Sequence, residues 1–477
     1  MISCIKIPEV TTLDPYMQSL RTQFNIRLVP SKKNVVNTMP PEVLAEIFLK
    51  LLEDDDTVLR HSARPLVSST CQSDPLLFGQ VCSYWRNVAL STPSLWARIY
   101  ILKPQKSQVR LTQLWLERAR THALDLSIWA PDVEQCDRFA INDIISLFMK
   151  RRQYWLTISF TIELRTLTSL SLVVQPAPNL HLLKSATLWV ENASDKAGKL
   201  DPTVDEMWKT IHTCKALKYV DWGTSYRHGP PEHCPWNQLT GLTLSSTLSF
   251  SQLLSILSLT PHLEFLFAPS LFSDSSDSSA LSLTPSPVTH ARLKTFKIAS
   301  NQETGPLFRL LSLPALQLLK ICNNFEEDVP RDLPGFQEFL EKSNPQQLTT
   351  FELEDFYLHE EDLRKYLISP QFCNLRRIVL FTEITDKVLH QLADIDKEGR
   401  HKVFPSLQVF CTSSASQQTR DGLLSNMIAS RFSPTKGRGL KEIGLYTGNL
   451  GPIDRLAISD MFKQGLDGSR MAGVYDR

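Results

Sequence analysis

The stretch that decides the fold reads LTGLTL at 239–244, FSQLLSIL at 250–257 and LEFLFA at 263–268. The two outer hexads share the form Leu-x-x-apolar-x-apolar, whose last two apolar residues fall on one face of a strand. Between the hexads, apolar residues recur at the spacing of an amphipathic helix. One period of the chain is therefore predicted to be a strand, a helix and the next strand.

The same hexad returns along the chain. Its leading residues are Leu183, Leu217, Leu239, Leu263, Leu293, Leu316, Leu348, Leu375, Leu407 and Leu440, with Leu167 a candidate earlier member. They lie 22 to 34 residues apart, about 29 on average. Such a unit cannot bury its apolar face alone, so neighbouring units are expected to stack. The spacing predicts an irregular, leucine-rich-repeat-like α/β solenoid over 161–477, and an unrelated open α/β arrangement is the alternative.

A different pattern occupies the N-terminal part of the chain. Met39-Pro40-Pro41-Glu42 opens an apolar stripe at helical spacing, because Pro suits a first helical turn and Glu complements the helix dipole there. The stripe consists of Val43, Leu44, Ile47, Phe48, Leu51 and Leu52. A second stripe, predicted to be one helix ended by Pro93, consists of Phe78, Val81, Cys82, Trp85 and Val88. Two short helices cannot bury both stripes against each other, so the rest of the chain or a partner must cover what remains.

These residues resemble a known family. Met39-Pro40-Pro41-Glu42-Val43-Leu44-x-Glu46-Ile47-Phe48, then Val81-Cys82-x-x-Trp85-Arg86-x-Val88-Ala89, then Pro93-x-Leu95-Trp96, are similar to an F-box of the type found in fungal F-box-like proteins. The resemblance covers about 60 residues and implies docking on a Skp-type adaptor, and through it on a cullin scaffold. The adaptor-binding residues that it implies are Pro40, Glu42, Leu44, Ile47, Phe48, Val81 and Trp85. The alternative is that the apolar members only pack inside a helical bundle, which is the commoner place for a large aromatic such as Trp85.

The predicted organisation follows from these patterns. Residues 1–36 form a flexible arm, and 37–100 form the F-box-like helical module with an acidic insertion at about 53–75. Residues 101–160 supply a connecting helix and first strands before the solenoid of 161–477. A Ser-rich segment at 270–288 is predicted to be a disordered loop, because its composition buries too little apolar surface to fold. Its Thr-Pro and Ser-Pro pairs are candidate phosphorylation sites, and a passive linker is the alternative.

Composition narrows the classes of function. The chain has 477 residues and a formal net charge of +1, so no whole-molecule field favours nucleic acid or an anionic membrane. No stretch reaches the roughly 18 apolar residues of a membrane span, and the N-terminus does not have the pattern of a signal peptide. Nine scattered cysteines without a Cys-x-x-Cys favour free thiols in a reducing compartment. We expect an intracellular protein, cytoplasmic or nuclear.

Motifs for catalysis and metal binding are weak. A phosphate loop, a nucleophile elbow and a His-Glu-x-x-His motif do not occur in the sequence. The best metal candidates are His212, Cys214, His228, His233 and Cys234, but their spacing matches no common zinc pattern and a structural role is preferred. We therefore expect a non-enzyme without a cofactor.

The resemblance and the repeats together predict a substrate-recognition subunit of a Skp–cullin–F-box ubiquitin ligase, with an unknown protein substrate on the repeat domain. Rival hypotheses are a non-degradative F-box scaffold, an interaction protein whose F-box has decayed at Met39 and the acidic insertion, and an enzyme. The candidate exposed positions of the hexads are Lys218, Thr240, Thr243, Lys294, Lys297, Glu352, Arg376, Arg377 and Lys441. They carry mixed charges, so the hexads do not identify the substrate.

Overall fold

The structure, a computed structural model, describes residues 39–54, 75–130, 136–164, 180–191, 200–223, 226, 230–273, 286–324, 331–412, 419–432, 439–445 and 450–468. Outside these residues lie the predicted arm, residues 55–74 of the predicted insertion, residues 274–285 of the Ser-rich segment and the hexad that starts at Leu167. The fold is mixed α/β, as the alternating pattern predicts, and its dominant element is a large parallel sheet.

Within the described residues the main sheet has fifteen strands, and fourteen of them follow one another in chain order. They are β1 (Arg98–Leu102), β2 (Leu124–Ala130), β3 (Trp155–Glu163), β4 (Ser185–Glu191), β5 (Tyr219–Asp221), β6 (Gly241–Thr243), β8 (Phe265–Phe272), β10 (Thr295–Ser300), β12 (Leu318–Asn323), β13 (Thr350–Glu354), β14 (Arg377–Phe381), β15 (Val409–Thr412), β16 (Glu442–Leu445) and β17 (Asp467–Gly468). The fifteenth, β7 (Leu248–Ser249), pairs with β8, while β9 (Val288–Thr289) and β11 (Leu311–Ser312) form a separate pair. All of these pairings are parallel, which requires a crossover after each strand.

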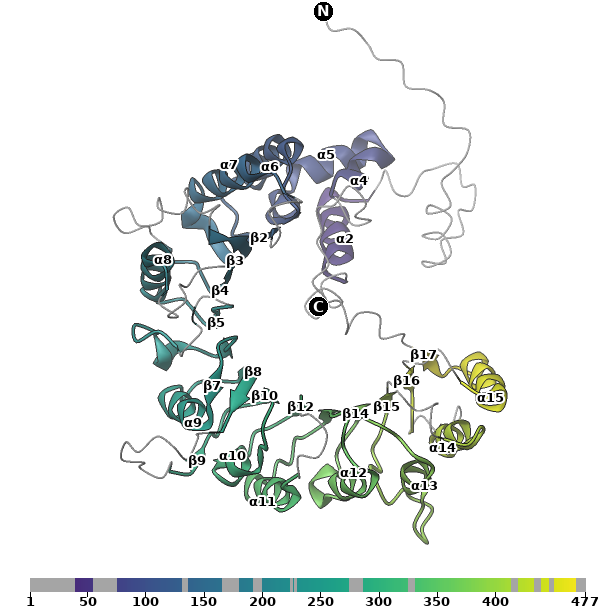
Figure 1. Ribbon diagram of the computed structural model, residues 1–477. Coiled ribbons are helices and arrows are strands. Elements are labelled where there is room, and N and C mark those ends of the chain that lie inside the picture. Colours follow the sequence, from purple (N-terminus) through teal and green to yellow (C-terminus); the bar gives the residue numbers. More distant parts are fainter. Residues whose placement is uncertain are drawn as a thin grey trace, which may run out of the picture.

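Helices supply most of the crossovers. After the N-terminal helices they are α6 (Lys106–Ala119), α7 (Arg138–Met149), α8 (Pro202–His212), α9 (Phe250–Leu259), α10 (Gly305–Arg309), α11 (Leu333–Ser343), α12 (Glu360–Leu367), α13 (Asp386–Ala393), α14 (Leu423–Arg431) and α15 (Pro452–Lys463), with short 3-10 turns at η4 (Arg152–Tyr154), η6 (Trp236–Gln238) and η7 (Pro370–Phe372). The strands line the inner side of an open arc and these helices lie on its outer side (Figure 1). Each crossover therefore returns on the same face of the sheet.

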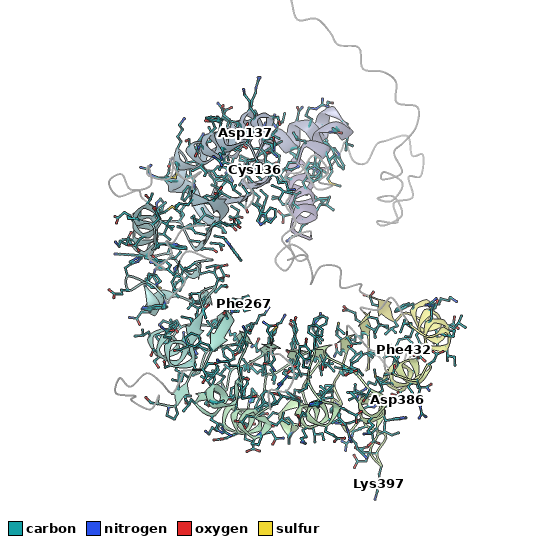
Figure 2. All side chains as sticks on the ribbon, in the orientation of Figure 1. Cys136, Asp137, Phe267, Asp386, Lys397 and Phe432 are labelled. Carbon is teal, nitrogen blue, oxygen red and sulfur yellow. The ribbon has the colours of Figure 1, made fainter. Side chains whose placement is uncertain are left out.

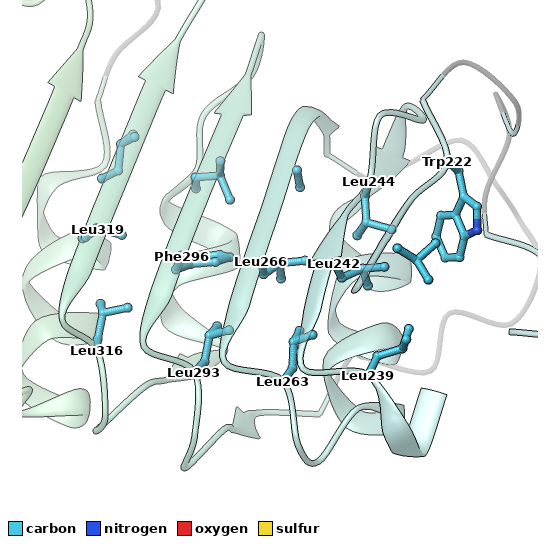
Figure 3. Close-up of a cluster of buried hydrophobic side chains, with 14 of the residues drawn as sticks. Trp222, Leu239, Leu242, Leu244, Leu263, Leu266, Leu293, Phe296, Leu316 and Leu319 are labelled. Carbon is cyan, nitrogen blue, oxygen red and sulfur yellow. The ribbon is translucent and has the colours of Figure 1, made fainter. Parts of the chain in front are cut away.

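The core lies between the strands and the outer helices. The apolar hexad residues are buried in register, so that Leu266, Phe296 and Leu319 stand side by side on β8, β10 and β12. The leading leucines form a second row at the turns before the strands, as Leu263, Leu293 and Leu316 show (Figure 3). Two hexads depart from the pattern: the buried Thr412 takes the third place after Leu407, and Leu445 is half-buried.

The sheet starts earlier than the first hexad. Strand β3 pairs with β4 so that Ile158 lies opposite Ala186 and Phe160 opposite Leu188. On its other side β3 continues into β2 and then β1 through the same parallel pairing. The strands of 98–163 thus share one sheet with those that follow.

Polar side chains form a buried row beyond the last apolar position of several hexads. Ser300, Asn323, Asp355 and Thr382 each stand two residues after the third apolar residue of a hexad and are at most 4% exposed. The Asn323 amide donates to Asp355 at 2.9 Å, and Arg331 donates to both oxygens of the same carboxylate at 2.9 Å. Because an unpaired buried charge is costly, this pairing is what permits a fully buried Asp355.

Candidate functional site

The segment with the F-box-like sequence folds into a small helical module at the β1 end of the arc. It consists of α2 (Pro41–Asp54), α4 (Pro75–Val81), α5 (Ser83–Ser91) and η2 (Pro93–Trp96) (Figure 1). The Pro40 carbonyl accepts hydrogen bonds from the amides of Val43 and Leu44, both at 3.1 Å, which starts α2 where the sequence places its first turn. Glu42 in that turn complements the positive end of the helix dipole.

One side of α2 holds the module together. Leu44 and Phe48, one helical turn apart, are 1% and 0% exposed. The Phe48 ring stacks on Phe78 of α4, with ring centroids 4.1 Å apart, and meets the half-buried Trp85 of α5 at 5.0 Å. The Tyr84 hydroxyl also donates to the carbonyl of Met39 at 2.5 Å. Leu44 and Phe48 therefore pack inside the module, which is the alternative that the sequence left open, while Trp85 packs against Phe48 and stays half-buried.

The other side of α2 is exposed and partly apolar. Ile47 is 39% exposed, and Val43, one turn earlier, is 48% exposed. Pro40 and Glu42 are exposed at the start of the same helix. Of the seven residues that the resemblance implies, Pro40, Glu42, Ile47 and Val81 are thus exposed. Val43 joins them although the resemblance did not single it out, and its i, i+4 spacing to Ile47 is the sequence signal that could have identified it.

The second apolar stripe does not form the single helix predicted from its spacing. Cys82 is extended, with φ −159° and ψ 172°, and it separates α4 from α5. Its sulfur accepts a hydrogen bond from the amide of Trp85 at 3.4 Å, so Cys82 caps the start of α5. The break leaves Val81 at the end of α4, where it is 51% exposed.

The module is firmly attached to the first unit of the sheet. Trp96 of η2 is buried, and its indole N–H donates to the carbonyl of Ala89 at 2.8 Å. The Trp96 ring packs edge-on against Trp115 of α6 at 5.5 Å, and the guanidinium of Arg118 lies 4.3 Å from the ring centroid. Because this contact joins η2 to α6 through buried aromatic surface, the module and β1 share one hydrophobic core.

The inner side of the arc is the second exposed region. Strand side chains project into the hollow, as Phe267 on β8 does in Figure 2. Of the positions expected to be exposed, Lys297, Glu352 and Arg377 lie on strands and are half-buried, whereas Thr243 is buried and hydrogen-bonded to the Tyr219 hydroxyl at 2.7 Å. The other five precede their strands, where Lys294 pairs with Glu264 at 2.7 Å. The list drawn from the hexads therefore captures only part of this face.

The candidate metal ligands near α8 form a hydrogen-bonded network. His212 Nδ1 and His233 Nδ1 are 2.7 Å apart, and His212 Nε2 accepts from the indole N–H of Trp222 at 3.3 Å. An indole only donates, so His212 carries its proton on Nδ1 and donates it to His233. His233 in turn donates through Nε2 to Asp205 at 3.3 Å, and Tyr226 donates to the same oxygen at 2.9 Å. The two imidazoles thus point their nitrogens at each other and at protein groups.

Burial sets the protonation states of this network. Burial, with a smaller contribution from His233, lowers the pKa of His212 to about 3, and burial raises the pKa of Cys214 to about 11. Burial also raises the pKa of Cys234 above its usual range. For Asp205, burial acts upward, but the hydrogen bonds from Lys209, Tyr226 and His233 outweigh it and lower the pKa. His212 is therefore neutral and the two thiols are protonated at neutral pH.

Metal sites and membrane spans can be assessed for the described part of the chain. In that part of the chain, no three or more His, Cys, Asp or Glu residues gather in a group that could hold a metal ion. The fifth candidate ligand, His228, lies outside the described residues. None of the helices described is both long and apolar enough to cross a membrane.

Comparison with models of protein families and with curated proteins finds no match to this chain.

Proposed function

We propose that this chain is a substrate-recognition subunit of a Skp–cullin–F-box ubiquitin ligase. In this proposal the helical module is an F-box that binds a Skp-type adaptor, and the arc is a leucine-rich-repeat-like solenoid that holds a protein substrate. The sequence resemblance supplies the ubiquitin part. The observation that carries the docking part is the exposed apolar side of α2, formed by Val43 and Ile47 beside Pro40 and Glu42.

Burial within the module narrows the proposed adaptor-binding surface. An adaptor would contact Pro40, Glu42, Val43 and Ile47, with Val81 as a further candidate. Leu44, Phe48 and Trp85 would act indirectly, by holding α2 against α4 and α5. Exposed apolar residues on consecutive turns of a helix are the usual means by which a helix enters a partner's groove.

The proposed role requires no chemistry from this chain. A receptor accelerates ubiquitin transfer by holding a substrate lysine near the catalytic subunits, which raises the effective concentration of that lysine. Such a role needs a fixed relation between the adaptor-binding module and the substrate-binding surface. The buried contact of Trp96 with Trp115 favours such a fixed relation, because it attaches the module to the first unit of the arc.

The test is a pull-down of the full chain with a purified Skp-type adaptor. A Val43→Asp, Ile47→Asp variant should lose binding by at least about tenfold, because it places two charges in an apolar contact. The matched control is Ile453→Asp, Leu456→Asp, which changes two apolar residues of α15 that are 58% and 70% exposed, at the other end of the arc. That control should bind the adaptor as the wild type does.

The outcomes separate the rival functions. A folded wild-type chain that does not bind the adaptor would exclude the ubiquitin-ligase proposal and leave a repeat-type interaction protein. Binding that is insensitive to the α2 variant would exclude α2 as the docking surface, and a Val81→Asp variant would show whether α4 takes part. Adaptor binding without ubiquitination of captured proteins by the reconstituted ligase would identify a non-degradative scaffold.

A further inference from the structure

Basic residues gather in the turns that precede four neighbouring strands. The turns are 120–123 before β2, 150–154 before β3, 180–184 before β4 and 213–218 before β5. Because these strands pair in parallel, the turns that precede them lie at the same edge of the sheet. The seven residues that form this basic edge are Arg120, Lys150, Arg151, Arg152, Lys184, Lys215 and Lys218.

Hydrogen bonds between consecutive turns hold the basic edge together. The amide of Lys184 donates to the carbonyl of Leu156 at 2.9 Å, and the amide of Lys218 donates to the carbonyl of Lys184 at 2.8 Å. The guanidinium of Arg151 donates to the carbonyl of Arg120 at 3.3 Å. Neighbouring strands lie about 4.8 Å apart, so the four turns follow one another over about 14 Å.

The positive charge of the basic edge is not neutralised within the described part of the chain. None of the seven residues forms an ion pair with a described residue, and the four turns contain no Asp or Glu. The carboxylates closest to these turns in the sequence belong to Glu117, Asp125 and Asp221, and each interacts elsewhere: with Gln113 at 3.0 Å, Arg98 at 3.8 Å and the amide of Gly223 at 2.9 Å.

Helix dipoles account for only some of these cations. Arg120 and Lys150 end α6 and α7, where a positive charge complements the helix dipole. Lys184 and Lys218 instead stand directly before strands β4 and β5, and both are exposed. The ammonium of Lys218 donates to a neutral group, the carbonyl of Gln238, at 3.4 Å. Because like charges on adjacent strands repel, an anion bound beside these two lysines would stabilise the edge.

We infer that the basic edge binds an extended acidic segment, rich in Asp or Glu, of a partner protein. Carboxylates form charge-assisted hydrogen bonds with Lys and Arg side chains. An extended chain advances about 3.4 Å per residue, so about five residues span the four turns. Naming this partner as the substrate rests on the proposed function, whereas binding itself does not involve the adaptor.

The composition of the turns favours a protein segment over a single-stranded nucleic acid. Surfaces that bind single strands combine cations with aromatic side chains on which the bases stack. The one Phe, Tyr or Trp residue in the four turns is Tyr154, which is half-buried and packs against the hydrophobic core. The basic edge therefore offers charge without a stacking platform.

Fluorescence anisotropy with a short fluorescein-labelled polyglutamate peptide tests the basic edge on the full chain. A polyglutamine peptide of the same length is the neutral probe. We expect the glutamate peptide to bind at least about tenfold more tightly than the glutamine peptide, and added salt to weaken its binding because ions screen exposed charges. Lys184→Gln with Lys218→Gln should weaken binding of the glutamate peptide about tenfold.

The matched control is Arg376→Gln with Lys441→Gln. These two residues are exposed, and they stand directly before β14 and β16 as Lys184 and Lys218 stand before β4 and β5. The control should bind the glutamate peptide as the wild type does, and circular dichroism should show that all variants are folded.

Three outcomes would refute the site: a wild-type chain that does not bind the glutamate peptide, binding that the Lys184 and Lys218 variant leaves unchanged, and an equal loss in the control. A labelled oligodeoxythymidine that binds more tightly than the glutamate peptide, through the same two lysines, would identify nucleic acid as the occupant and would also refute it. Because the adaptor pull-down is independent, loss of this site leaves the proposed function standing, and the reverse also holds.

Discussion

His212 is a candidate metal ligand by its sequence position, but in the structure its side chain has a structural role. Its two nitrogens are occupied by Trp222 and His233, and its ring stacks on Trp208 with centroids 5.3 Å apart. Protonation would put a second proton on Nε2, where the indole of Trp222 already donates. The folded state therefore favours the neutral ring, and burial is the main cause.

The burial of neutral His212 predicts that the stability of the fold depends on pH. The pKa of His212 is about 3 in the folded chain and about 6.5 when unfolded, so the unfolded chain binds the extra proton between these values. The stabilisation is fully present above pH 6.5 and is lost as pH falls toward 3, at up to about 1.4 kcal/mol per pH unit. We expect His212→Gln to lose less stability than the wild type between pH 7 and pH 4.5, measured as urea midpoints by tryptophan fluorescence. His390→Gln, at an exposed position of α13, should decline as the wild type does. Equal declines in all three proteins would contradict this account.

Among the elements, the hexads were the most predictable part of the chain. Their strict spacing identifies which residues face the core, and the structure confirms burial of nearly all of them. The strand β3 is one of the first strands predicted for 101–160, but it was not counted with the hexads because Trp155 stands in the leading place of Trp155-x-x-Ile158-x-Phe160, although the spacing is the same.

Helix orientation was less predictable than helix position. The apolar stripe of α2 is wide enough to be divided between core and surface, and spacing alone does not say where the division falls. The stacking of Phe48 on Phe78 decides it, and Trp85, beyond the break at Cys82, meets the same ring. A cysteine cap is a weak sequence signal, since Ser, Thr, Asp and Asn are the usual caps.

The division of α2 into two sides gives a prediction. Phe48→Ala should destabilise the helical module by about 3–5 kcal/mol, because it removes a fully buried ring. Ile47→Ala should change stability little, since the side chain is exposed. Hydrogen exchange should show faster exchange of amides in 41–54 for the first variant and unchanged exchange for the second. Similar protection of these amides in both variants would show that α2 does not depend on its buried side.

At the scale of the whole molecule, the strand order makes the fold nearly one-dimensional. A strand pairs only with its neighbours along the chain, so contacts between distant units are few and stability is close to a sum over neighbouring units. The sequence predicted the alternation of strands and helices that builds the parallel sheet. The register of the inner face could not be read from it, because the number of residues between consecutive strands varies and only the pairing decides which residues become neighbours.

A core substitution in the middle of the arc should therefore have a local effect. Phe296→Ala removes a buried ring between Leu266 and Leu319 and should cost about 3–5 kcal/mol. Hydrogen exchange should accelerate in β8, β10 and β12 and stay unchanged in β1 and β16. Phe139→Ala, at a phenylalanine that is 82% exposed, is the matched control and should leave exchange unchanged. Uniform acceleration along the whole sheet would show that the arc unfolds as one cooperative body.

The chain-order pairing also bears on how the protein is made. Phe296 of β10 pairs with Leu319 of β12, and Leu319 pairs in turn with Phe351 of β13. Each of these strands therefore pairs with a strand that lies only a few tens of residues earlier in the sequence. Nothing in this sheet has to wait for the C-terminus, unlike a closed barrel in which the last strand must meet the first. Synthesis from the ribosome proceeds from the N-terminus, and units can fold as they emerge. The sheet can thus assemble in the order of translation, and the helical module can pack on α6 while the last strands are still being translated.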